Sequence, residues 1–173
     1  MSSDERTLLE NRRFAVVERS VTKPGGRVAT LQYVRHFGSV AILPILDDGQ
    51  ICLIRNRRLT VDKLLIEIPA GTRERDEPAL ETAHRELAEE TGYRAGSMEE
   101  LTVYYPSPGI LTERMHVYVA RNLTPGEPAR EANEEIENYV LPWGEALAMV
   151  DRGEIDDGKT ILSILAYDRA RSR

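Results

Sequence analysis

Three glutamates near the middle of the chain have the types and spacing that suit metal chemistry. Glu86 and Glu90 lie four residues apart, with Glu89 beside them. At about 100° per residue, the first two share one side of a helix and Glu89 lies at its margin. Carboxylates one turn apart repel, so a cation should compensate them. Mg²⁺ or Mn²⁺ take such oxygen ligands, often together with a substrate phosphate, whereas the alternative is a solvated acidic face.

The helix that carries these glutamates has clear limits. Pro78 suits a first helical turn, and Gly92 suits the left-handed position that ends a helix. Between them, one other side of the helix is suited to packing: Leu80, Ala83, Leu87 and Thr91. The pattern therefore predicts a helix with one packing face and one face of oxygen ligands.

The whole segment resembles a known motif. Gly71 is followed by five residues, Glu77, seven residues and then the run RELAEETGY from Arg85 to Tyr93. This resembles the Nudix box, with every fixed letter present. Tyr93 is aromatic where the family has an aliphatic residue, which affects packing rather than chemistry. The resemblance implies an enzyme that cleaves nucleoside diphosphates linked to another group, with Arg85 and Glu77 orienting the carboxylates and the loop.

Composition limits the class of protein that could carry this metal site. A chain of 173 residues, 41% hydrophobic and 30% charged, predicts one globular domain with at most a small appendage. The net charge of −6 argues against a nonspecific nucleic-acid binder. Cys52 is the only cysteine, so an intrachain disulfide is excluded and a buried apolar role is expected. Neither a signal peptide nor a membrane span is recognisable, and we expect a cytoplasmic protein with no membrane or nucleic-acid partner.

Hydrophobic periodicity predicts the elements around the motif. Two hairpins are expected, 14–21 with 28–35 and 40–46 with 51–55, and the strand at 40–46 should be central in a sheet. A strand at 64–68 should deliver the loop at Ala70 and Gly71. Further strands are expected at 101–105, 115–120 and 136–141, then helices at 143–150 and 161–167 with Gly153 and Gly158 marking the break between them.

Strands mixed with three helices predict an α/β protein with a mixed β-sheet between helices. The resemblance implies the Nudix α/β/α sandwich over residues 38–173, and it leaves residues 1–37 as a small N-terminal antiparallel β-layer. In the similar branch of the family this layer is exchanged between two subunits. The resemblance thus implies a homodimer formed through the N-terminal layer.

Three short runs resemble the ADP-ribose pyrophosphatase branch. They are EIPAG from Glu67 to Gly71, YPSPG around Pro108, and TER around Glu113. A rigid connection between strands would also explain the proline-rich turn. The resemblance implies that Glu67 and Pro108 belong to the substrate-binding site and that Glu113 binds the terminal ribose hydroxyls. Arg58 would contact a phosphate or ribose, which suits a planar guanidinium; the alternatives are an exposed basic turn for Arg58 and a rim carboxylate for Glu113.

The resemblance also implies a metal set and a base. Mg²⁺, with Mn²⁺ as the other candidate, would bind Glu86, Glu90 and the Ala70 carbonyl, with Glu89 in support. Glu134 is expected either to bind metal or to supply the base, although Ala132 replaces a glutamate common in the family. The general base is therefore Glu134, Glu135 or a glutamate of the box, and a solvated acidic loop is the alternative reading.

The activity implied is metal-dependent hydrolysis of ADP-ribose to AMP and ribose 5-phosphate. The box is shared with GDP-mannose pyrophosphatases and other nucleoside-diphosphate-sugar hydrolases, so these stay open. From another class, a non-catalytic sensor that binds ADP-ribose is a third hypothesis.

Overall fold

A computed structural model describes residues 5–130 and 135–172 of the chain. The elements, in chain order, are β1 (Glu5–Glu10), β2 (Phe14–Thr22), β3 (Val28–His36), β4 (Ser39–Pro44), β5 (Gln50–Arg58), β6 (Lys63–Glu67), β7 (Ala70–Thr72), α1 (Ala79–Thr91), β8 (Arg94–Tyr104), β9 (Met115–Thr124), β10 (Ile136–Pro142), α2 (Trp143–Asp151) and α3 (Gly158–Arg171). In this part of the chain, none of the helices combines the length and the apolar character needed to cross a membrane.

Strand β4 is central, as predicted. It pairs antiparallel with β7 and parallel with β9, in a mixed sheet of order β7-β4-β9-β8. A second sheet has the order β10-β5-β6. Successive β4 side chains enter two different cores: Ala41 and Leu43 face one, Val40 and Ile42 the other. Because both faces are covered, nearly every residue of this strand is apolar.

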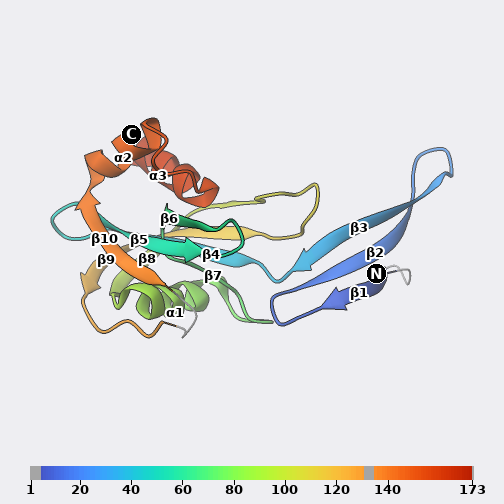
Figure 1. Cartoon of the computed structure of the whole chain (residues 1–173), viewed down its shortest axis with the longest axis horizontal. Coiled ribbons are helices and arrows are strands. Elements are labelled where there is room, and N and C mark those ends of the chain that lie inside the picture. Colours follow the sequence, from blue (N-terminus) through green and yellow to red (C-terminus); the bar gives the residue numbers. More distant parts are fainter. Residues whose placement is uncertain (1–4, 131–134, 173) are drawn as a thin grey trace.

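Helices cover both sides of these sheets, which confirms the α/β/α architecture (Figure 1). Helix α1 lies on one side, where Ala83 and Leu87 pack with β4, while α2 and α3 lie on the other. The larger core lies between the two sheets and under α2 and α3, and it includes Trp143 and Tyr167. This packing fixes α1 against β4, and β7 is hydrogen-bonded to the same strand.

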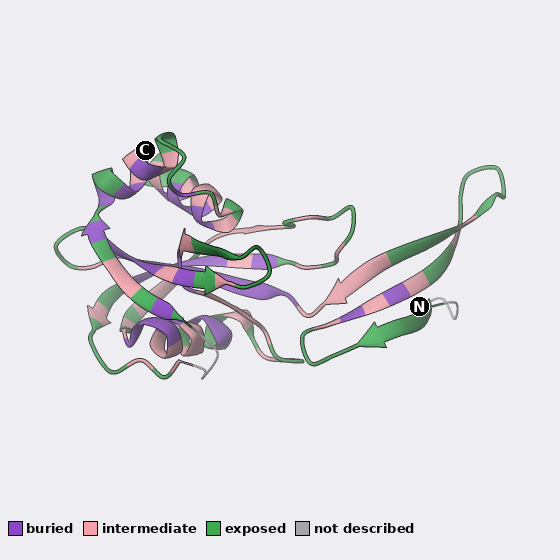
Figure 2. Cartoon of the chain, in the orientation of Figure 1, coloured by how far each residue is buried: buried purple, intermediate pink, exposed green. Residues whose placement is uncertain are grey.

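The N-terminal β-layer is an antiparallel sheet of order β1-β2-β3 that projects from the rest of the molecule (Figure 1). Strand β1 is exposed along its whole length (Figure 2). Backbone hydrogen bonds attach β3 to the loop before β9: Val34 N donates to Ile110 O at 2.8 Å, and Thr112 N donates to Val34 O at 2.9 Å. Within the described residues, these bonds attach the N-terminal β-layer to the sandwich at its inner end.

The expected hairpin between 40–46 and 51–55 is wrong. β4 and β5 lie in different sheets, and Ile45, just after β4, forms an isolated bridge with Ile51 of β5. Both edges of β4 are already taken by β7 and β9, so β5 pairs with β10 and β6 instead. Sequence periodicity reports which residues are buried, and it does not report which strands pair.

Smaller differences concern α1, α3 and the segment after β6. Leu80 is 44% exposed, whereas Ala79 is partly buried in the α1 core, so the packing face is rotated by one position at its start. Gly158 begins α3 instead of preceding it, because the Asp157 side chain accepts a hydrogen bond from Thr160 N. The predicted loop at Ala70 is the short strand β7.

Candidate active site

Helix α1 lies close to β7 at Gly71. A Cβ atom on Gly71 would lie 1.9 Å from Cδ of Glu86, so no other residue fits there without moving that carboxylate. Both elements are anchored on β4, one by side-chain packing and the other by the ladder. The glycine that opens the motif therefore allows the Glu86 side chain to lie directly against the strand.

Glu90 lies deeper in the same place. It is 4% exposed, and its Oε2 accepts a hydrogen bond from Ala70 N at 2.9 Å. The structure thus brings together two residues that were predicted as metal ligands, Ala70 and Glu90. Their contact is through the amide of Ala70.

Arg85 connects the other carboxylates of α1 to the loop before it. Its Nε donates to Glu77 at 3.1 Å, and one terminal nitrogen donates to Glu86 at 2.7 Å and to Glu89 at 2.9 Å. The Arg85 hydrogen bond lowers the pKa of Glu77 from 4.5 to about 2. In return, these carboxylates raise the pKa of Arg85. One guanidinium therefore holds three carboxylates in a defined arrangement.

Arg58 is positioned by a buried carboxylate. Its guanidinium donates to both oxygens of Glu67, at 2.8 and 2.7 Å, and Lys159 of α3 donates to Glu67 at 2.5 Å. Glu67 is completely buried. Burial raises the pKa of Glu67, but the hydrogen bond from Arg58 and the charge of Lys159 outweigh it, so that the pKa is lowered overall. Glu67 therefore lies behind Arg58, where it orients the guanidinium and does not face the cavity.

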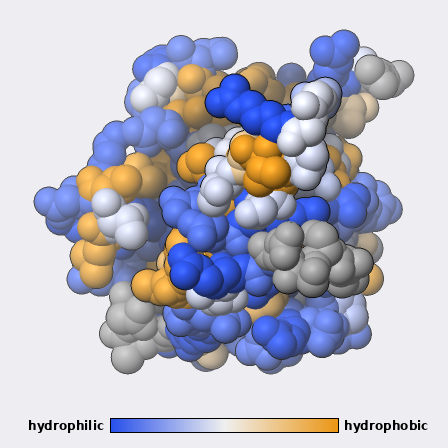
Figure 3. Space-filling view, turned by 90° about the vertical axis from the view of Figure 1, so that its right-hand side faces the viewer, coloured by the Kyte–Doolittle hydropathy of each residue, from blue (hydrophilic) through white to orange (hydrophobic). Residues whose placement is uncertain are grey.

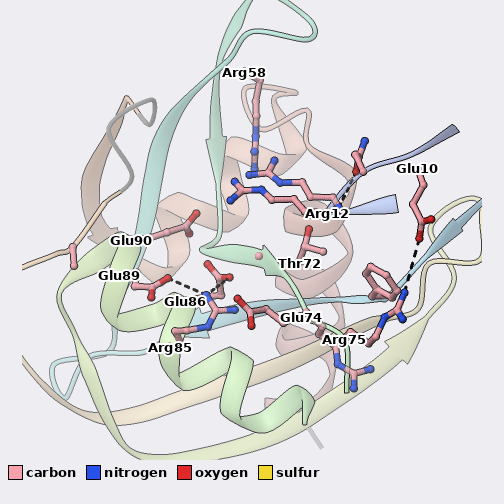
Figure 4. Close-up of a pocket in the computed structure, with 16 residues that line it drawn as sticks. Glu10, Arg12, Arg58, Thr72, Glu74, Arg75, Arg85, Glu86, Glu89 and Glu90 are labelled. Atoms are coloured by element: carbon pink, nitrogen blue, oxygen red, sulfur yellow. Dashed lines mark hydrogen bonds and ion pairs between the residues drawn. The ribbon is translucent and has the colours of Figure 1, made fainter. Parts of the chain in front are cut away.

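These groups surround a cavity of about 470 Å³. Figure 4 shows Arg12 and Arg58 on one side of it and the carboxylates of Glu86, Glu89 and Glu90 on the other. Its lining comes from the end of β1, the β1–β2 turn, the β3–β4 link, β5, β7 and the following loop, α1 and the segment after β9. The residues are Glu10, Asn11, Arg12, Arg13, Phe37, Arg58, Gly71, Thr72, Arg73, Glu74, Arg75, Arg85, Glu86, Glu89, Glu90 and Ala129. A cationic wall thus faces an anionic one.

Part of the cationic wall was not foreseen from sequence. Arg12 and Arg13 belong to the β1–β2 turn, yet they line the cavity. Two adjacent arginines in an acidic chain were the available signal, but only the folded N-terminal β-layer shows that its turn reaches the site. Arg75, also in the lining, is paired with Glu10 at 3.9 Å and lies 5.4 Å from the ring centre of Phe37. These contacts link the β-layer to the loop before α1.

Other predicted residues lie elsewhere. Pro108 is exposed in the turn before β9 and is not part of the cavity lining. Glu113 is also outside the lining, where it accepts a hydrogen bond from the Ser39 hydroxyl. Glu135 is exposed, and its carbonyl accepts a hydrogen bond from Arg57 N at 3.2 Å. Glu134 falls outside the described residues.

The donor chemistry of the cavity fits a hard divalent cation. Glu86, Glu89 and Glu90 present carboxylate oxygens to one space, which is the ligand type that Mg²⁺ and Mn²⁺ prefer. Within residues 5–130 and 135–172, no three His, Cys, Asp or Glu side chains lie close enough together to hold one metal ion. Arg85 holds Glu86 and Glu89, and the Ala70 amide holds Glu90. Each of these carboxylates has a second oxygen and further lone pairs with which it could bind a cation.

Comparison with known proteins identifies the family. The NUDIX domain model matches residues 35–163. An ADP-ribose pyrophosphatase of Bacillus subtilis (strain 168) is 35% identical over 94% of this chain and 92% of its own length. An ADP-ribose pyrophosphatase of Mycobacterium tuberculosis is 37% identical over 88% of this chain and 75% of its own. A GDP-mannose pyrophosphatase of Cronobacter sakazakii is 36% identical, covering 75% and 72%.

A solved structure supports the fold independently. The crystal structure of an ADP compounds hydrolase superposes with a TM-score of 0.82 over 96% of this chain and 91% of that one, at 20% identity. This likeness extends through the N-terminal β-layer as well as the sandwich, since it covers nearly the whole chain.

Proposed function

The chain belongs to the NUDIX family and is a Nudix pyrophosphohydrolase, and on that premise we propose that it hydrolyses ADP-ribose to AMP and ribose 5-phosphate. The single observation that carries the proposal is the cavity in which Arg12 and Arg58 face Glu86, Glu89 and Glu90. A diphosphate carries negative charge that arginines neutralise directly, and carboxylates reach it only through a bridging cation.

The divalent cation of this family would be Mg²⁺ here, held by Glu86 and Glu90, with Glu89 beside them and the Ala70 carbonyl as a further ligand. Such a cation would activate water and stabilise charge on the phosphoryl oxygens. The residues themselves perform two tasks. Arg58, fixed by Glu67 and Lys159, binds and orients a phosphate or the adjoining ribose. Arg85 holds Glu86 and Glu89 in place before the substrate enters.

The reaction consumes one water molecule. Its oxygen forms a new bond to one phosphorus, the bond from that phosphorus to the bridging oxygen breaks, and the bridging oxygen leaves with the other phosphate. A carboxylate must accept the proton of the water. Among the described candidates, Glu89 is the best placed, because it lines the cavity and its side chain is 41% exposed. Glu134 and Glu135 are the other candidates.

GDP-mannose is the second candidate substrate, supported by the similarity to GDP-mannose pyrophosphatases over three quarters of this chain. It shares the diphosphate bridge, so the same carboxylates and arginines would serve it. The purine and the sugar are what distinguish the two substrates. The sensor hypothesis loses its support, because the arginine and the three glutamates at the end of the motif all line the cavity, namely Arg85, Glu86, Glu89 and Glu90.

A panel of nucleotide sugars, incubated with and without Mg²⁺, tests the proposal. We expect ADP-ribose to be the preferred substrate, with AMP and ribose 5-phosphate as the two products and no turnover in EDTA. Preferential cleavage of GDP-mannose would replace ADP-ribose by the second candidate. Turnover that is unaffected by chelation would refute the metal-dependent mechanism.

We also propose that residues 1–37 form a layer distinct from the sandwich of residues 38–173 and that this layer joins two chains in a homodimer. The projecting sheet exposes apolar side chains that a partner could cover, namely Leu8, Leu9, Val28 and Leu31. Figure 3 shows this end of the molecule, with apolar patches among hydrophilic side chains. A cytoplasmic location belongs to the same proposal and agrees with the buried, unpaired Cys52.

A further inference from the structure

The C-terminal end of α1 lies in an unfavourable electrostatic setting. Glu89 and Glu90 lie in its last turn, next to the negative end of the helix dipole, and no basic residue belongs to that turn. The last carbonyls of a helix also lack partners within the helix. An acidic helix end that is also partly buried therefore needs donors and positive charge from elsewhere in the chain.

The structure supplies a partner for each of these carbonyls from outside the helix or from its cap. Gly92 N donates to Ala88 O at 3.0 Å, and Ala129 N donates to Glu89 O at 2.9 Å. Arg130 Nε donates to Glu90 O at 2.9 Å, and Asn138 Nδ2 donates to Thr91 O at 2.8 Å. Arg130 thus brings the missing positive charge, directly onto the carbonyl of Glu90.

The segment that provides two of these donors lies close against the helix end. A Cβ atom on Gly92 would lie 2.3 Å from the carbonyl oxygen of Gly126, and Gly92 has φ of 81°, so glycine is required on both counts. Farther along the same segment, Ala129 lines the main cavity. Residues 126–130 therefore connect the end of α1 to the rim of the active site.

Arg130 and Asn138 also bind each other. The terminal nitrogen of Arg130 donates to Asn138 Oδ1 at 2.9 Å, and Asn138 is part of β10, opposite Ile54 of β5. The two side chains thus form a bridge from the helix end to the second sheet. A planar guanidinium can donate to both Glu90 O and Asn138 Oδ1 at once, whereas the single ammonium nitrogen of a lysine lacks this fork geometry.

We propose that Arg130 and Asn138 are positioning residues for the divalent cation, because their bridge fixes the end of α1 that carries Glu89 and Glu90. This inference rests on the proposed metal-dependent function. Arg130 does not coordinate the cation; it acts through the helix. Interactions that orient metal ligands in this indirect way are commonly worth about 10- to 100-fold in metal affinity.

The sign of the effect distinguishes positioning from charge alone. If Arg130 acted only through its charge, its removal would make the carboxylate site more negative and would tighten cation binding. If it acts by fixing the helix end, its removal weakens binding although the site becomes more negative. Arg130→Met removes both charge and hydrogen bonds, Arg130→Lys keeps the charge without the fork, and Asn138→Ala breaks the bridge from the other side with no change of charge.

The experiment measures Mn²⁺ binding to the full-length protein by calorimetry, without substrate, beside Mg²⁺-dependent hydrolysis of ADP-ribose. We expect all three variants to bind Mn²⁺ about 10-fold more weakly or worse. They should also need correspondingly more metal for half-maximal turnover. Arg121→Met is the matched control, because it removes the same charge and a hydrogen bond to Tyr167 away from the cavity. Its Mn²⁺ affinity should equal that of the wild type.

Tighter or unchanged Mn²⁺ binding by Arg130→Met, or wild-type binding by Arg130→Lys, would overturn the inference. Thermal unfolding identifies a variant that fails to fold, and in that case Asn138→Ala decides. A wild-type enzyme that hydrolyses its substrate while the variants bind Mn²⁺ normally refutes only the positioning role. A wild type that neither binds Mn²⁺ nor hydrolyses nucleotide sugars refutes the proposed function, and the positioning role with it.

Discussion

Among single residues, Glu90 combines the deepest burial of the box carboxylates with a place in the cavity lining. Its Oε2 accepts a hydrogen bond from Ala70 N, in the strand that opens the site. Water screens a buried charge less than an exposed one, so the charge of Glu90 should act strongly on a cation bound in the cavity.

Glu90→Gln should therefore abolish most metal-dependent turnover. The amide keeps the size and one acceptor oxygen but removes the negative charge, and we expect kcat to fall by roughly 100-fold or more at fixed Mg²⁺. Steady-state hydrolysis of ADP-ribose measures it. Glu81→Gln, on the exposed side of the same helix, is the control and should keep wild-type turnover. Equal activities of the two variants would contradict the assignment of Glu90.

The Glu77–Arg85 pair predicts a pH dependence of stability. The pKa of Glu77 is lowered from 4.5 to about 2 in the folded protein. A carboxyl whose folded pKa is depressed contributes stability that is present above its ordinary pKa and lost as pH falls toward the folded value. The excess unfolding free energy of the wild type over Glu77→Gln should therefore shrink as pH is lowered from 4.5 to about 2. Urea unfolding of both proteins across that range measures this difference, and a constant difference would show that the pair is not formed.

At the level of elements, the site depends on the distance between α1 and β7. Helix α1 packs on β4 through Ala83 and Leu87, and β7 pairs with the same strand. Gly71 and the Glu86 side chain occupy the space between α1 and β7. A small change in this distance should therefore change the chemistry without unfolding the protein.

Gly71→Ala should displace the Glu86 carboxylate, because the new Cβ would lie 1.9 Å from its Cδ. We expect weakened Mn²⁺ binding and at least about 10-fold lower turnover, with the fold retained. The control is Gly144→Ala in α2, whose Cβ would meet nothing within 4 Å and which should leave activity unchanged. Calorimetry and circular dichroism separate loss of the site from loss of structure. Wild-type Mn²⁺ affinity in Gly71→Ala would show that Glu86 is not a ligand.

Helix α3 contributes to the site through its first turn. Lys159 shares the buried Glu67 with Arg58, so Lys159→Met would leave that carboxylate with one cationic partner. We expect a loss of about 1–3 kcal/mol in unfolding free energy, below the usual cost of an unpaired buried charge because Arg58 remains. Lys63→Met, which removes an exposed pair with Asp156, should cost less than about 1 kcal/mol. Chemical denaturation measures both, and equal losses would contradict the role of burial.

At the scale of the whole molecule, the N-terminal β-layer has two roles. Its β1–β2 turn lines the cavity, while its outer strands project with exposed apolar side chains. A small sheet held at one end is poorly stabilised in water unless something packs against it. A second copy of the chain is the proposed partner.

Leu31→Asp should convert the proposed dimer to a monomer, because Leu31 is 46% exposed on β3 and a charge there would be buried in the interface. Sedimentation analysis over a range of concentrations measures the change, and activity should fall with it if the layer must be held in place. Leu165→Asp, at an exposed position of α3, is the control and should leave the assembly unchanged. A wild-type monomer at all concentrations would refute the dimer.

The sequence alone was sufficient for the local features of this protein. The helix between Pro78 and Gly92, the central position of β4 and the charged residues of the motif could be predicted, because each depends on residue types at short spacing. Recognition of the motif also indicated the family and the α/β/α fold.

Only the tertiary structure decided which distant residues meet. Strand β4 pairs with β7 and β9 instead of β5, and Arg12 lines the cavity. Arg130 and Asn138 hold the end of α1. All of these features involve contacts between separate elements. Such contacts are set by which edges and faces remain free once the core has packed. Hydrophobic periodicity reports burial of a side chain but not its partner, so this part of the site could not be found from spacing alone.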